Sequence, residues 1–183
     1  MFRRTASGHF AGYSLIGGFF LATAAMASVA LTFSVLQAQN ETPKGPSEEV
    51  KAALSELKIQ YEIDEDNDYK VELQTQGNRT QLCYILSESG KWSTLNYREV
   101  WSPAHVYEGQ LSPELAERVL RDSGQRLIGG WCVTDWGEGR KCLYFTAKVP
   151  PNLSAKSLHE VMSVVALVAD TLEKEISGET DTY

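Results

Sequence analysis

The chain has 183 residues and a formal net charge of −7, from 17 Lys and Arg against 24 Asp and Glu. This length accommodates one ordinary domain with its own core. Apolar residues make up 43% and charged residues 22%, which excludes a wholly disordered chain. The acidic balance argues against nucleic acid, which is bound by basic surfaces, and three cysteines are too few for a disulfide scaffold.

The N-terminal part has the pattern of an export segment. Arg3 and Arg4 precede an uncharged, apolar run over residues 15–36. Such a run is typical either of a signal peptide cleaved after Ala38 or of a retained membrane anchor, and both alternatives stay open. Both place the rest of the chain outside the cytoplasm, because basic residues remain inside. We therefore expect a periplasmic or secreted protein, or one anchored in the inner membrane by residues 15–36.

A short polar stretch separates this segment from the folded part. Thr42-Pro43 and Gly45-Pro46 are typical of a linker and precede Ser47, where the first helix is expected. The predicted division is residues 1–38 (signal peptide or membrane anchor), 39–46 (linker), 47–178 (folded domain) and 179–183 (C-terminal tail).

The domain begins with a helix and a strand. Ser47 is a good N-cap and is followed by two acidic residues, which suit the positive end of a helix. Apolar residues then recur at helical spacing, so we predict a helix over 48–59. Farther on, Tyr69, Val71 and Leu73 alternate with polar residues and predict a strand with one buried face.

Two more strands are predicted before the second helix. Residues 82–86 again alternate, with apolar side chains at every second position. Ser89-Gly90 is typical of a turn and leads to a short third strand over 92–97. We expect residues 98–111 to be irregular.

The C-terminal half contains two helices on either side of a hairpin. Ser112 is the predicted N-cap of the second helix. A turn at 136–139 joins two strands, expected near 127–135 and 141–148. Ser154 begins a long final helix with an apolar stripe, which ends at Gly178.

The predicted order of elements is α-β-β-β-α-β-β-α. Strands joined by short turns pair in antiparallel fashion. Helices packed on one side of such a sheet form a two-layer domain. We therefore expect an α+β fold with a five-stranded antiparallel sheet.

Several short sequence segments of the domain, together with the predicted order of helices and strands, resemble those of a known family. They are Tyr61-Glu62-Ile63-Asp64 with Asp68-Tyr69-Lys70-Val71, Leu115-Ala116-Glu117-Arg118-Val119-Leu120, Val149-Pro150-Pro151-Asn152-Leu153-Ser154, and Val168-Ala169-Asp170-Thr171-Leu172-Glu173. Over residues 47–178 the chain resembles the YbjN domain family, which is described as bacterial sensory transduction regulators. The resemblance implies a fold like that of type III secretion chaperones, which bind proteins and often dimerise. It implies no catalytic residues.

An acidic stretch before the first strand has part of a calcium-loop pattern. Asp64, Asp66 and Asp68 alternate as such a loop requires, but Tyr69 stands where an EF-hand needs Gly, and Thr75 where it needs Glu. We therefore predict an acidic turn that leads into a strand.

The histidines and cysteines have no spacing that indicates a metal or catalytic site. His105 and His159 lack a ligand partner at helical or loop spacing. A zinc site would have to combine His105 with Cys83, Cys132 and Cys142, whose spacing has no zinc signature. Nothing in the sequence orients a Cys–His nucleophile pair. We predict no catalytic residue, no metal and no cofactor.

Two cysteines flank the turn at 136–139. If Asp135 and Gly139 pair across that turn, Cys132 and Cys142 lie opposite each other on one face. An exported protein meets oxidising conditions, so we predict a disulfide between them, with Cys83 left free. A register slip of one residue would separate the pair.

The aromatic residues indicate where an interaction surface would lie. Helices should cover the sheet face that carries Tyr69 and Phe145, which leaves Ile85, Tyr144 and the two paired cysteines on the opposite face. Trp136, in the turn of the same hairpin, is a candidate binding anchor because Trp is enriched among residues that dominate binding energy. The alternative is that Trp136 folds back onto its own hairpin.

The predicted function is binding rather than catalysis. We expect an exported, non-enzymatic protein-binding or regulatory module, whose partner is an unknown protein or a second copy of the chain. We expect no nucleic acid, and membrane contact only through an uncleaved N-terminal segment. The alternative is an enzyme or a small-molecule-binding protein of the cell envelope, with a site that the sequence does not reveal.

Overall fold

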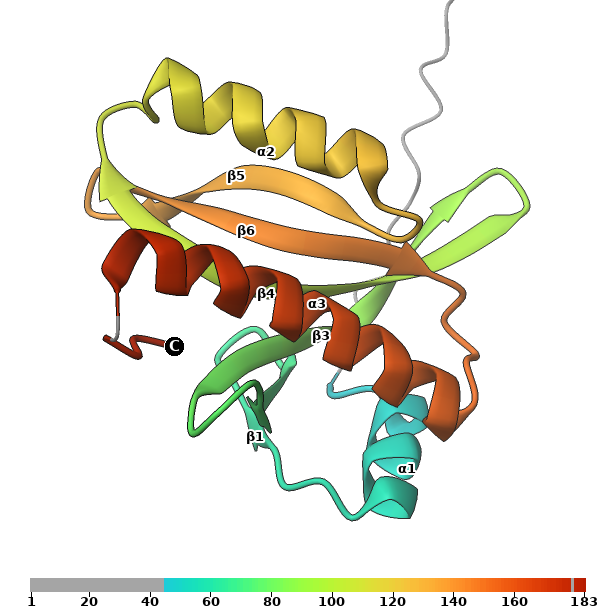
Figure 1. Cartoon of the computed structure of the whole chain (residues 1–183). Coiled ribbons are helices and arrows are strands. Elements are labelled where there is room, and N and C mark those ends of the chain that lie inside the picture. Colours follow the sequence, from blue (N-terminus) through green and yellow to red (C-terminus); the bar gives the residue numbers. More distant parts are fainter. Residues whose placement is uncertain (1–44, 179) are drawn as a thin grey trace, which may run out of the picture. The chain divides into compact units, whose positions relative to one another are not determined.

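The computed structural model describes residues 45–178 and 180–183. The predicted signal peptide or anchor, and most of the predicted linker, lie outside the described residues. The elements of the described part are α1 (Glu48–Leu57), β1 (Glu62–Ile63), β2 (Tyr69–Gln74), β3 (Thr80–Trp92), β4 (Leu95–Glu108), α2 (Pro113–Gln125), β5 (Gly130–Gly137), β6 (Arg140–Val149) and α3 (Ala155–Ser177) (Figure 1). None of the helices within this part is both long and apolar enough to cross a membrane.

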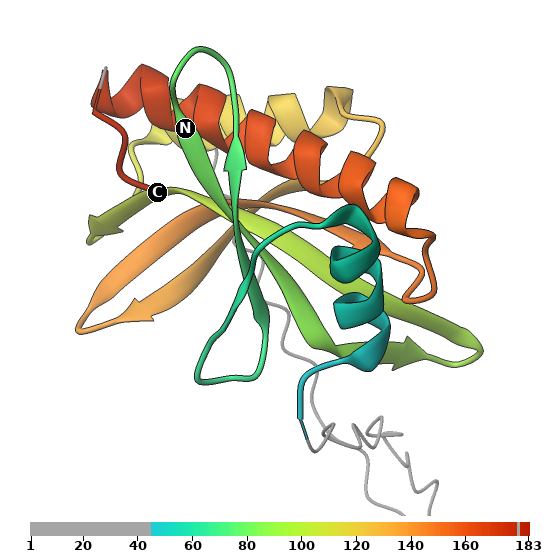
Figure 2. The ribbon, with the colours of Figure 1, turned by 90° about the horizontal axis from the view of Figure 1, so that it is seen from below.

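The described residues form an α+β domain with a single antiparallel sheet, as predicted. The strand order is β1-β2-β3-β4-β6-β5, and each neighbouring pair is antiparallel. The described part contains six strands and not five, because β1 adds a two-residue strand beside β2. The helices lie on one side of this sheet, and Figure 2 shows α1 and α3 on that side.

The helix starts are those that the sequence indicates. In each case a serine hydroxyl accepts a hydrogen bond from a backbone N–H of the first turn, which would otherwise lack a partner. The three caps are Ser47 for α1 (from Val50, 3.4 Å), Ser112 for α2 (from Leu115, 3.2 Å) and Ser154 for α3 (from Ser157, 3.1 Å).

The long hairpin of β3 and β4 corrects two predictions. The strands have 13 and 14 residues, so the predicted turn at Ser89-Gly90 lies inside β3 and the region expected to be irregular is mostly strand. The turn falls at Ser93, whose φ is 55°. Register shifts between Ile85 and Ser89 and between Pro103 and His105 explain the error, because each bulge breaks the two-residue alternation from which strands are predicted.

The core lies between the helices and one face of the sheet. Tyr69, Val71 and Phe145 are fully buried on this face, as predicted, and Leu143 is 1% exposed. The helices contribute buried side chains that pack against them, chiefly Leu54 of α1, Val119 of α2, and Leu158, Met162, Val165 and Leu172 of α3.

Candidate functional site

An aromatic cluster occupies the face of the sheet that the helices leave open. Tyr84 of β3 lies directly opposite Trp101 of β4, and Trp101 lies opposite Thr146 of β6. Tyr144 is two residues before Thr146, so its side chain projects from the same face. The Tyr84 and Trp101 rings are stacked, with centroids 4.3 Å apart and planes at 10°.

Trp136 completes this cluster. Its ring meets the ring of Trp101 edge-on at 6.0 Å and 83°, while Tyr144 meets Trp101 at 5.4 Å and 71°. A register shift between Asp135 and Gly137 re-aims the end of β5. Trp136 therefore neither projects freely nor packs only on its own hairpin, because its ring reaches β4. We call Tyr84, Trp101, Trp136 and Tyr144 the aromatic cluster; all four side chains are half-buried.

The tyrosines of the aromatic cluster stay protonated at neutral pH. Burial raises the pKa of Tyr144 to about 12, and the nearby Glu99 and Cys132 add to this shift. Burial also raises the pKa of Tyr84, against the opposing effect of Lys70. The cluster therefore offers apolar ring surface and neutral hydroxyl groups, a combination that suits contact with another surface.

Charged residues border the aromatic cluster. The Thr146 hydroxyl donates a hydrogen bond to Glu99 Oε1 at 2.7 Å. Lys70 Nζ donates to Glu62 Oε2 at 3.1 Å near Tyr84. An apolar centre with a polar rim is the arrangement found in protein–protein interfaces.

Ile85 does not belong to this face, so its predicted place in an interaction surface is wrong. It lies directly opposite Tyr69 in the β2–β3 register and is fully buried in the core. The alternation of Leu82, Tyr84 and Leu86 is real, but these residues take the open face and are half-buried. The side chains between them face the helices instead.

The hairpin register also corrects the predicted pairing of the cysteines. Cys132 lies opposite Tyr144, and Cys142 lies opposite Thr134, so the two cysteines are diagonal neighbours on one face. The pairing is two residues away from the predicted one because the bulge near Gly137 changes the turn. All three cysteines are free thiols in the structure, with Cys83 and Cys142 buried and Cys132 exposed.

The structure separates the residues of the conceivable zinc site. Cys83 lies beside Ile85 on the core side of β3, while Cys132 and Cys142 share the open face. His105 stacks on Tyr107 at 5.5 Å, and burial lowers the pKa of its imidazole. A zinc ion needs each ligand atom within about 2.3 Å of itself. Cys83 cannot join Cys132 and Cys142 in such a site, because the backbone of the sheet lies between them.

The acidic turn before β2 is a structural feature, as predicted. Asp64 Oδ1 accepts hydrogen bonds from the backbone N–H groups of Asp66 and Asp68, at 3.0 and 2.9 Å. Asn67 takes a left-handed conformation with φ of 66°, which this residue type tolerates in turns. The side chains thereby close the turn between β1 and β2.

Sequence reasoning missed a buried cluster of charges at the C-terminal end of α3. Arg79 Nε donates to Asp170 Oδ1 at 2.6 Å, and Arg79 Nη2 donates to Glu173 Oε2 at 3.1 Å. Asp181 adds a third carboxylate 3.3 Å from Nη2, and it also accepts from the backbone N–H of Thr80 at 3.0 Å. The available signal was the pair of acids within the apolar stripe of α3.

One group of carboxylates among the described residues is close enough together to hold a metal ion. It consists of Asp170, Glu173 and Asp181, whose carboxylate oxygens lie within 4.8 Å of one another. The guanidinium of Arg79 already occupies the position of a counter-cation and bonds to all three. The arrangement is that of a buried clamp between the start of β3, α3 and the C-terminal residues.

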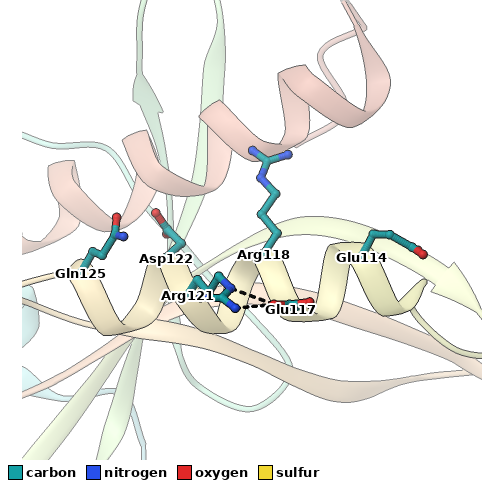
Figure 3. Close-up of a pocket in the computed structure, with 6 residues that line it drawn as sticks. All are labelled: Glu114, Glu117, Arg118, Arg121, Asp122 and Gln125. Carbon is teal, nitrogen blue, oxygen red and sulfur yellow. Dashed lines mark hydrogen bonds and ion pairs between the residues drawn. The ribbon is translucent and has the colours of Figure 1, made fainter.

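A hollow of about 480 Å³ on α2 is lined by charged and polar residues. Figure 3 shows Arg121 reaching Glu117 on the same helix, while Arg118 points toward α3. Arg118 forms an ion pair with Glu175 of α3. Because these charges are paired on an exposed helix face, the hollow has the character of a solvated surface.

No protein-family model matches the chain, and no curated protein matches it at a significant level.

Proposed function

We propose that the domain is an exported, non-enzymatic protein-binding module that contacts its partner through the aromatic cluster. The observation that carries the proposal is the position of the cluster. Tyr84, Trp101, Trp136 and Tyr144 gather on the sheet face that no helix of the described part covers. The resemblance of residues 47–178 to the YbjN domain family supports a binding or regulatory role.

The chemistry of the cluster supports a protein partner. Rings of Trp and Tyr supply large contact area at a low cost in side-chain entropy, since each has only two side-chain torsions. They are enriched among the residues that dominate binding energy. Stacking between Tyr84 and Trp101 holds the rings in place before a partner arrives.

The ionisable groups near the cluster support binding over proton transfer. The pKa of Tyr144 lies at about 12, far above the pH at which a general base works. The thiol of Cys142, on the same face, has its pKa raised by burial to about 11, so it is protonated at neutral pH and a poor nucleophile.

Affinity capture from an envelope fraction tests the proposal. Full-length chain with a C-terminal tag should retain a partner, and Trp136→Ala should lose most of it. Trp92→Ala is the matched control, because Trp92 is 77% exposed at the tip of the β3–β4 hairpin and outside the cluster. Equal capture by wild type and Trp136→Ala would contradict a role for the cluster.

The alternative, a small-molecule site, has its own measurement. A ligand that binds only the folded state raises the melting temperature, and its stabilisation grows with the logarithm of its concentration relative to its dissociation constant. A panel of small envelope metabolites should leave the melting temperature unchanged if the domain binds proteins. A reproducible, concentration-dependent rise with one compound would favour the small-molecule alternative.

A further inference from the structure

The outer part of the β3–β4 hairpin carries two large exposed apolar side chains at its tip. Trp92 is 77% exposed and Leu95 is 68% exposed, and they are opposite each other on the two strands. The two-residue turn between them, Ser93-Thr94, is polar. Figure 1 shows this hairpin, between the ends of β3 and β4, projecting from the body of the domain.

Contacts near its base hold the hairpin in a fixed direction. Tyr97 lies opposite Gly90, and its ring crosses so closely that a Cβ on Gly90 would be 2.2 Å from it. Lys148 Nζ lies 5.4 Å from the centre of the same ring. Arg98 Nη1 donates to the carbonyl of Ser87 at 2.8 Å across the two strands. The tip is therefore presented by an ordered arm.

The chain from the N-terminal segment joins the domain at the base of this arm. The backbone N–H of Ser47 donates to Ser87 Oγ at 3.0 Å, and Arg98 Nη2 donates to Ser47 Oγ at 3.1 Å. The uncharged run over residues 15–36 ends 11 residues before Ser47. An extended chain of that length spans at most about 40 Å, and the strand from Ser87 to Trp92 reaches about 17 Å.

We propose that Trp92 and Leu95 dip into the interfacial region of the bilayer that holds the uncharged N-terminal segment. Trp is the side chain that prefers this region, because its ring is apolar and its N–H finds polar partners at headgroup depth. Leu95 adds apolar surface beside it, and the hydroxyls of Ser93 and Thr94 suit the headgroup layer. The proposal requires a retained anchor, and it is independent of the aromatic cluster.

The domain is covalently joined to the retained anchor, so even a contact of two side chains is sufficient to orient it on the membrane. Two side chains bury less apolar surface than one acyl chain, which by itself gives only reversible membrane binding. A short tether converts the contact into an intramolecular step with a high effective concentration. The result is a domain held in one orientation on the membrane.

The far end of the sheet supplies a control. In the β4–β6 register, Arg98 pairs with Val149 at the hairpin end, while Glu108 pairs with Arg140 at the other end, next to Trp136. Val133 is 47% exposed on β5 and lies outside the hairpin. Trp136 and Val133 should therefore stay outside the bilayer when Trp92 and Leu95 meet it.

Quenching by brominated lipid tests the proposal on the full-length chain in phosphatidylcholine vesicles. All four tryptophans, Trp92, Trp101, Trp131 and Trp136, follow the N-terminal segment, so the signal reports on the domain. The difference in tryptophan fluorescence between the wild type and Trp92→Phe gives the contribution of Trp92 to the emission. Bromine in the upper acyl chain should lower that contribution at least about twofold and should leave the contribution of Trp136, obtained from Trp136→Phe, unchanged.

A second variant separates lipid contact from altered tryptophan packing. Leu95→Ser should reduce the quenching of Trp92, whereas Val133→Ser should not. The proposal is overturned if Trp92 is not quenched by brominated lipid and remains open to aqueous iodide. It is equally overturned if Trp92 is shielded from both quenchers, which would indicate a protein or a second copy on the hairpin. Capture through the aromatic cluster should be unaffected by Trp92→Phe, so the two proposals fail separately.

Discussion

At the residue scale, buried charge is concentrated around Arg79. Its side chain is 8% exposed, and those of Asp170 and Glu173 are 4% and 2% exposed. Removing one partner of a buried ion pair leaves the others without compensation, which costs far more than the pair itself contributes. The Arg79 cluster is therefore where a single substitution should affect folding most.

We predict that Arg79→Ala lowers the free energy of unfolding by about 3–5 kcal/mol in denaturant titrations at neutral pH. Arg79→Lys, which keeps the charge but lacks the fork of N–H donors, should lose less. Arg121→Ala is the control, because its ion pair with Glu117 is exposed and such pairs contribute less than about 1 kcal/mol. A similar loss for Arg79→Ala and Arg121→Ala would contradict the assignment of Arg79 as a buried clamp.

The same cluster predicts a pH dependence. Burial is the largest cause that raises the pKa of Glu173, while hydrogen bonds from Thr182 and the charge of Arg79 lower it. A carboxyl with a raised folded-state pKa favours folding below its unfolded pKa, and that contribution is lost as the pH rises through the folded pKa. Arg79→Ala removes a nearby positive charge and so raises the pKa of Glu173 further. The loss of unfolding free energy in Arg79→Ala, relative to the wild type, should therefore become smaller as the pH falls from about 7 to about 5. A deficit that stays constant or grows would contradict this.

The thiols give a second prediction at this scale. Burial raises the pKa of Cys83 and Cys142, whereas Cys132 is exposed. Alkylation of the folded protein without reductant should therefore label Cys132 alone, and alkylation in denaturant should label all three. Intact mass measures both counts. A single label in denaturant would show that the bridge predicted from the sequence does form.

The sequence predicts the roles of residues that interact with near neighbours in the chain better than the roles of residues whose partners are distant. The serine caps were predictable because each bonds a residue three positions away. Arg79 and Asp170 are 91 positions apart, and no pattern in the chain links them. Trp101 was visible as an aromatic residue, but its place in the cluster depends on the pairing of four strands, β3, β4, β6 and β5.

At the element scale, the helices were predicted more accurately than the strands. The periodicity of α3 continues over 23 residues, so its bounds follow from its apolar stripe. The long strands β3 and β4 each contain a bulge, and the phase of alternation changes there. This explains why residues 98–111 are predicted to be irregular. Ile85 precedes the bulge, and its face is mispredicted because apolar side chains occur on both faces of β3 over residues 82–86.

The connection from α2 to β5 gives the prediction at this scale. Gly129 has φ of 79°, and a Cβ there would lie 2.6 Å from the backbone oxygen of Thr146 and from the ring of Phe145. We expect Gly129→Ala to lower the free energy of unfolding by about 2–4 kcal/mol, from backbone strain and overpacking together. Gly139→Ala is the matched control, since its φ is 77° but nothing lies within 4 Å, and it should lose about 1–2 kcal/mol. Equal losses would show that the close approach at Gly129 is unimportant.

At the scale of the whole molecule, location is the first matter to test. Arg3 and Arg4 before the uncharged run over residues 15–36 predict that the domain lies outside the cytoplasm. A C-terminal alkaline phosphatase fusion should therefore be active, because that enzyme folds only under oxidising conditions. Mass spectrometry of the N-terminus distinguishes cleavage from anchoring. An inactive fusion with full-length protein in the cytosol would refute export.

The central claim is that the aromatic cluster binds a partner and does not only stabilise the sheet. A cluster residue that dominates binding should weaken association without unfolding the domain, whereas a core residue should do the reverse. Trp136 is the best position for this distinction, because it lies near the end of β5 and contacts the cluster through Trp101.

The most direct measurement is the dissociation constant of the Trp136→Ala complex, with the captured partner or with a second copy, and the melting temperature of the same protein beside it. We predict binding at least about fivefold weaker, equivalent to about 1 kcal/mol, with the melting temperature of the wild type. An unchanged dissociation constant in a domain that melts earlier would show that Trp136 serves the fold, and it would contradict the claim.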